Sequence, residues 1–127
     1  MNQDDIPKYA LMEIERRWLV DAAAVGDLAT TPYRLIDDLY VGDSRLRLRR
    51  ITDPSANTLF KFGKKYGKHS PLSEPITNLY LTEGEYQALA CLTGFSVSKR
   101  RYAIAGGSLD VYQRPRSGLM VFELEFD

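Results

Sequence analysis

The sequence is poor in the residues on which several kinds of protein site depend. It contains one cysteine, Cys91, and one histidine, His69, among 127 residues. One cysteine excludes an internal disulfide, and the pair provides too few ligands for a Cys/His zinc site. His69 lies in the loop-like segment GKHSP with no partner pattern around it, so we expect a solvated rather than a catalytic histidine. Any chemistry must therefore depend on carboxylates, arginines and lysines.

Long apolar runs and an excess of one charge are also lacking. No stretch approaches the ~18 apolar residues of a membrane-spanning helix, and the N-terminal MNQDDIPKYA lacks the pattern of a secretory signal. Lysine plus arginine and aspartate plus glutamate each number 17, so the formal net charge is zero. Dedicated binders of nucleic acids or membrane surfaces usually have a clear basic excess. The sequence therefore predicts one cytoplasmic domain, residues 1–127, with neither nucleic acid nor membrane among its partners.

The dominant pattern is an alternation of apolar and polar residues, which is typical of β-strands. The period changes once, where Thr82 and Glu85 form a capping-box pattern and Gly94 offers a stop, which predicts a helix over 83–92. Eight antiparallel strands joined by short turns tend to close, because closure removes exposed edges. The predicted fold is α+β but mainly β, an eight-stranded antiparallel closed barrel with one helix outside. Its strands are expected over 11–20, 33–41, 45–49, 58–65, 75–81, 96–104, 108–113 and 118–126.

On several predicted strands, one face is apolar and the other carries charges of nearly one sign. Residues two apart on a strand lie about 7 Å apart on the same face, so like charges there repel unless an opposite charge lies between them. The acidic rows are Glu13 and Glu15, followed by Arg17, on the first strand, and Glu123 and Glu125 on the last. The basic rows are Arg45, Arg47 and Arg49, then Lys61 and Lys65, then Lys99 and Arg101.

Acidic and basic rows suit different ligands. Glutamates on two strands suit a hard divalent cation such as Mg²⁺ or Mn²⁺, which prefers oxygen ligands. Rows of arginine and lysine suit a polyanion, because guanidinium groups match phosphate oxygens in pairs. Together the rows predict a metal–polyphosphate site inside the barrel. The alternative is that each charged face lies in water, as in many amphipathic strands; the nearly single sign of each face favours the interior site.

The first of these segments, MEIERRWLV at 12–20, resembles the opening signature of the CYTH superfamily, the triphosphate tunnel metalloenzymes. That signature is Glu-x-Glu-x-Lys, and it matches Glu13, Glu15 and Arg17, with arginine in place of lysine. Other segments resemble the family in the same order along essentially the whole chain. They are RLRLRR with Arg47 and Arg49, FKFGKK with Lys61 and Lys65, KRRY with Lys99 and Arg101, LDVY with Asp110, and VFELEF with Glu123 and Glu125.

The resemblance implies a metal-dependent triphosphatase, acting inside the tunnel on inorganic triphosphate or on an organic or nucleoside triphosphate. It implies Mg²⁺ or Mn²⁺ on Glu13, Glu15, Glu123 and Glu125, and a catalytic role for Glu13, Glu15 and Arg17. The other matched basic residues would bind phosphates, and Asp110 is a further site residue. Two alternatives stay open. One is a tunnel that binds a polyphosphate or nucleotide without cutting it; the other is a class IV adenylate cyclase-like activity, although no segment indicates an adenine pocket.

Two further features depart from the family pattern. The predicted fifth strand, PITNLYL at 75–81, has Thr77 and Asn78 where family members carry acidic residues, which favours the binding-only alternative. The chain ends at Asp127, soon after the last glutamates, whereas many members continue with a helical tail. We therefore expect one tunnel mouth to be more open, or to be covered by a partner chain as in a homodimer; the third alternative is that the sequence is a truncated form.

Two local assignments depend on strand register. A bulge at Gly63 would turn Lys64 inward in place of Lys65. We expect Asp37 and Asp38 to lie at a strand end or on the surface rather than beside a metal.

Overall fold

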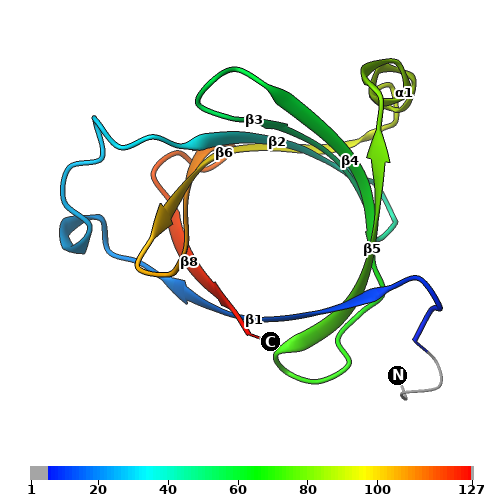
Figure 1. The fold of residues 1–127 in the computed structure, drawn as a ribbon, viewed down its shortest axis with the longest axis horizontal. Coiled ribbons are helices and arrows are strands. Elements are labelled where there is room, and N and C mark those ends of the chain that lie inside the picture. The colour runs from blue at the N-terminus through cyan, green and yellow to red at the C-terminus, as the bar shows by residue number, and fades with distance from the viewer. Residues whose placement is uncertain (1–5, 127) are drawn as a thin grey trace.

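The computed structural model describes residues 6–126 and shows a closed antiparallel barrel (Figure 1). The predicted fold class is confirmed. Around the barrel the strand order is β1-β5-β4-β3-β2-β6-β7-β8, and β8 pairs back onto β1. The strands are β1 (Leu11–Leu19), β2 (Arg34–Val41), β3 (Leu46–Thr52), β4 (Thr58–Lys65), β5 (Ser73–Leu81), β6 (Gly94–Ile104), β7 (Gly107–Arg114) and β8 (Met120–Glu125).

The main helix, α1 (Glu83–Leu89), lies outside the barrel beside β4 and β5 (Figure 1). It begins as predicted, because the Thr82 hydroxyl accepts a hydrogen bond from the Glu85 amide while the Glu85 carboxylate accepts one from the Thr82 amide. It ends earlier than predicted. Gly94 is not a helix stop but the first residue of β6, where a side chain would collide with the Tyr40 backbone. No helix within residues 6–126 has both the length and the apolar character needed to cross a membrane.

Much of the buried apolar surface lies outside the barrel rather than within it. Leu48 and Phe60 point outward from β3 and β4, and the Phe60 ring packs 4.7 Å from that of Tyr86 on α1. On the opposite side, Tyr102 packs against Tyr33, with ring centroids 5.6 Å apart; Tyr33 follows a segment that contains the short 3-10 helix η2 (Ala22–Ala24). Because side chains alternate along a strand, this outward packing turns the charged faces into the barrel.

Candidate functional site

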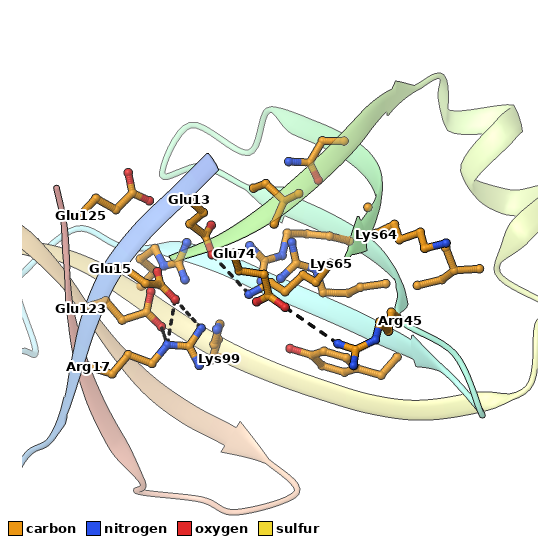
Figure 2. Close-up of a pocket in the computed structure, with 18 of the residues that line it drawn as sticks. Glu13, Glu15, Arg17, Arg45, Lys64, Lys65, Glu74, Lys99, Glu123 and Glu125 are labelled. Atoms are coloured by element: carbon orange, nitrogen blue, oxygen red, sulfur yellow. Dashed lines mark hydrogen bonds and ion pairs between the residues drawn. The ribbon is translucent and has the colours of Figure 1, made fainter. Parts of the chain in front are cut away.

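The inward charged faces enclose a cavity of about 340 Å³ (Figure 2). This volume is within the ~300–1,000 Å³ typical of small-molecule sites. Eight arginines and lysines and five glutamates line it. The predicted site residues that line the cavity are Glu13, Glu15, Arg17, Arg47, Arg49, Lys65, Lys99, Arg101, Glu123 and Glu125; Lys61 and Asp110 lie elsewhere on the inner face.

The two signs of charge occupy different parts of the cavity wall. All five glutamates come from the contiguous strands β5, β1 and β8, where Glu13 is the Cα partner of Glu74 and Glu15 is that of Glu125. Apart from Arg17, the basic lining residues come from β6, β3 and β4 and from the turn before β3. In Figure 1, β1 lies across the barrel from β2, β3 and β6. The cavity therefore has an acidic wall facing a basic wall.

Three glutamates of the acidic wall form a carboxylate cluster. Glu13, Glu15 and Glu125 each offer an oxygen, and these oxygens lie within 4.8 Å of one another. Mg²⁺ holds oxygen ligands at about 2.1 Å, so two of its ligands lie at most about 4.2 Å apart. Small side-chain rotations would therefore bring the three oxygens onto one ion. Glu15 is buried whereas Glu125 is exposed, which leaves room for the waters that Mg²⁺ usually retains.

Arg17 lies among the carboxylates rather than on the basic wall. Its Nη2 is 2.7 Å from Glu15 Oε1, and its Nε is 3.2 Å from Glu123 Oε1 (Figure 2). Burial raises the pKa of Glu123, and nearby Glu15 and Asp110 raise it further although Arg17 lowers it. Glu123 thus lies against Arg17 and outside the cluster of Glu13, Glu15 and Glu125.

Glu74 is a lining residue that the sequence interpretation missed. Strand β5 begins at Ser73, two residues earlier than predicted, and places Glu74 opposite Glu13. Its carboxylate accepts a hydrogen bond of 3.0 Å from the Gly67 amide and lies 3.9 Å from Arg45. The predicted fifth strand, 75–81, carries no acidic residue, but the observed strand β5 starts earlier and brings one carboxylate, that of Glu74, to the cavity. The alternation of side chains could have found it, since Glu74 shares its strand face with Ile76 and Asn78. The strand was predicted to begin at Pro75, because proline within a sheet is usually confined to the start of a strand or to its edge.

Two aspartates on the inner face of the barrel hold cations of the basic wall in place. Asp38 accepts two hydrogen bonds from Arg49, and Asp110 accepts two from Arg101 and lies 2.9 Å from the Lys99 ammonium. Asp110 has no exposed surface, so it supports the wall without lining the cavity. The expectation that Asp38 lies at a strand end or on the surface is wrong, because it faces Arg49 inside the barrel at 3% exposure.

Arg47 and Lys61 differ from these paired cations. Among residues 6–126, neither has a carboxylate within ion-pair distance. The Arg47 Nε is buried without a hydrogen-bond partner in the part of the chain described, and burial followed by the nearby Arg49 lowers its pKa. Burial, Arg49 and Arg47 likewise lower the pKa of Lys61. Such cations favour an anion between them.

The register of β4 decides between the two adjacent lysines. Pairing with β5 continues without a bulge, so Lys65 points inward and its ammonium lies 3.4 Å from Glu13. Lys64 is exposed at the cavity border, with its ammonium 5.1 Å from the centre of the Tyr66 ring. Lys65 is therefore the interior lysine.

A scan against models of known protein families finds no match for this sequence, and a search of the curated proteins finds none. The function is therefore inferred from the cavity and its residues.

Proposed function

We propose that this protein is a metal-dependent triphosphatase, with its substrate held between the basic and acidic walls. The observation that carries the proposal is Arg47, a cavity-lining arginine that has no carboxylate within ion-pair distance among residues 6–126, on the wall opposite three clustered glutamates. A triphosphate supplies the extended negative charge that this wall lacks. Guanidinium and ammonium groups are the usual partners of phosphate oxygens.

We propose separate roles for the basic residues and for the clustered glutamates. Arg49, Lys99 and Arg101 are fixed by buried aspartates, so they are oriented before the substrate enters. Glu13, Glu15 and Glu125 would hold Mg²⁺ or Mn²⁺, which when bound supplies a Lewis acid and neutralises charge on phosphoryl oxygens. A carboxylate of this cluster can accept the proton of the attacking water. The basic wall stabilises the negative charge of the transferred phosphoryl group.

The test is release of phosphate from inorganic triphosphate with Mg²⁺ or Mn²⁺. Glu15→Gln removes one charge from the carboxylate cluster and is expected to lower kcat/KM by at least about a hundredfold. Glu83→Gln is the matched control, because Glu83 lies exposed on α1 and should leave turnover unchanged. Absence of turnover with any divalent cation, in a folded protein that binds triphosphate, would reject the hydrolase.

A second candidate is a tunnel that binds a polyphosphate or nucleotide without cleaving it. The observation that favours it is the position of Arg17, whose guanidinium occupies the space between Glu15 and Glu123. An arginine there neutralises part of the acidic wall without a metal. Calorimetry separates the candidates, since this one predicts tight triphosphate binding together with no phosphate release.

A further inference from the structure

Two aromatic side chains adjoin the cavity where its lining is exposed to solvent. Tyr40 is a lining residue and is 40% exposed. Phe95 is its Cα partner across β2 and β6 and is 56% exposed, and the two ring centroids lie 6.5 Å apart. Their planes are inclined by 42°, and because both residues are exposed the two rings form an accessible aromatic surface.

This aromatic pair is directly continuous with the basic wall. Tyr40 is the Cα partner of Phe95 on one side and of Arg47 on the other. The two aromatic residues and Arg47 therefore lie in a row across β6, β2 and β3. Arg45, two residues before Arg47, lines the cavity with 61% of its side chain exposed and is labelled in Figure 2. A ligand with its phosphates at Arg47 therefore has a neighbouring surface for a flat apolar group.

We propose that Tyr40 and Phe95 form a subsite for the planar base of a nucleoside triphosphate, whose phosphates lie along the basic wall. The inference rests on the proposed function and deepens it, because it selects a nucleoside triphosphate over inorganic triphosphate. Nucleobases stack on exposed aromatic rings. The guanidinium groups of Arg45 and Arg47 favour a neutral ring over a cationic one, because like charges repel.

Tyr80, another exposed aromatic next to an interior cation, is less suited to this role. Tyr80 is 67% exposed on β5, and the Lys61 ammonium lies 5.5 Å from the centre of its ring. That contact already occupies a ring face, and Tyr80 is not among the described residues that line the cavity. Tyr80 therefore provides a matched control for Phe95.

The experiment is calorimetric titration with ATP and, separately, with inorganic triphosphate, in EDTA so that no metal-dependent hydrolysis occurs. Loss of one stacking ring is expected to weaken ATP binding to Phe95→Ala by at least fivefold. The same variant should bind inorganic triphosphate within twofold of the wild type, because this ligand has no base. Tyr80→Ala should bind both ligands within twofold of the wild type.

Each outcome decides the inference. If Phe95→Ala weakens both ligands equally, or neither, the subsite is rejected while triphosphate binding by the wild type leaves the proposed function standing. If the wild type binds neither ligand, either in EDTA or with Mg²⁺ present, the subsite and the proposed function both fail. Phe95→Leu retains apolar bulk without a ring face and should show the same selective loss, which covers the case in which Phe95→Ala does not fold.

Discussion

Arg49 and Asp38 form a buried ion pair with two parallel hydrogen bonds, from Nε to Oδ1 at 2.7 Å and from Nη2 to Oδ2 at 2.8 Å. Their side chains are 7% and 0% exposed. Arg47 lies two residues away on the same face of β3 and, among the described residues, has no carboxylate partner. Arg49 therefore has a structural partner in Asp38, whereas Arg47 can pair with a ligand.

This difference predicts opposite results for the same substitution at adjacent sites. Arg49→Met leaves the Asp38 charge buried and unpaired, which should lower the free energy of unfolding by about 3–5 kcal/mol. Arg47→Met should change it by no more than about 1 kcal/mol, yet weaken triphosphate binding at least tenfold. Urea unfolding and calorimetry measure the two quantities. Equal destabilisation by both substitutions would show that Arg47 has a structural role after all.

Lys61 is expected to lower the stability of the free protein. Burial, Arg49 and Arg47 depress its pKa, so its charged form is disfavoured in the fold. The fold is free of this penalty only above the lysine pKa of the unfolded chain. As pH falls through the folded pKa the lysine is charged in both states, and the full penalty applies. Lys61→Met should therefore raise Tm at pH 7 by roughly 1–4 °C, and this gain should shrink as pH approaches the ordinary lysine pKa.

The exposed Lys68 supplies the control for that melting experiment. Lys68→Met removes the same charge from the surface and should leave Tm unchanged both at pH 7 and near the ordinary lysine pKa. A decrease in Tm for Lys61→Met at pH 7 would show that an unrecognised partner stabilises the ammonium.

The strands and the direction of their charged faces could be predicted because both follow from a period of two. A run such as MEIERRWLV places Glu13 and Glu15 on one face whatever the rest of the chain does. The nearly single sign of that face favoured an interior position. A face in water normally mixes the two signs, whereas neighbouring like charges repel unless an opposite charge lies between them. Closure of the barrel then placed Glu15 and Arg47 around one cavity.

The pairing of individual charges could not be predicted, because it depends on register between distant strands. Asp38 meets Arg49 only because β2 and β3 pair with that offset, and Asp110 meets Arg101 through a register that shifts at Ser98 and Lys99. No local pattern encodes such an offset. For the same reason the sequence identified the basic rows but did not indicate which of their cations would have a carboxylate partner.

Arg17 is expected to compete with a divalent cation for the acidic wall. Its guanidinium contacts the carboxylate of Glu15, which is a member of the carboxylate cluster. Arg17→Met removes this competitor, so the apparent Kd for Mn²⁺ should fall by about tenfold, and Mn²⁺ should raise Tm more than in the wild type. Arg16→Met is the control, because Arg16 is the exposed neighbour on the outer face. An unchanged Mn²⁺ response in Arg17→Met would contradict the competition.

Asp110 should make the barrel sensitive to acid. Although burial raises its pKa, Arg101 and Lys99 hold it below the ordinary aspartate value. Stability from a depressed carboxyl pKa is present above the unfolded pKa, near 3.8, and is lost as pH falls through the folded pKa. Asp110→Asn leaves two cations without their carboxylate, which should lower the free energy of unfolding by about 3–5 kcal/mol at pH 7.

That deficit should narrow when the same urea titrations are repeated at pH 3, because this pH lies below the unfolded pKa and the Asp110 carboxyl of the unfolded wild type then takes up a proton, which removes part of the stability that the charged carboxylate provides. Asp43→Asn, at an exposed turn where the backbone φ is 53°, should follow the wild type at both pH values, since asparagine tolerates this conformation. A deficit for Asp110→Asn that stays constant from pH 7 to pH 3 would mean that the aspartate acts through its shape rather than its charge. Lys99 and Arg101 would then be positioned by something other than this carboxylate.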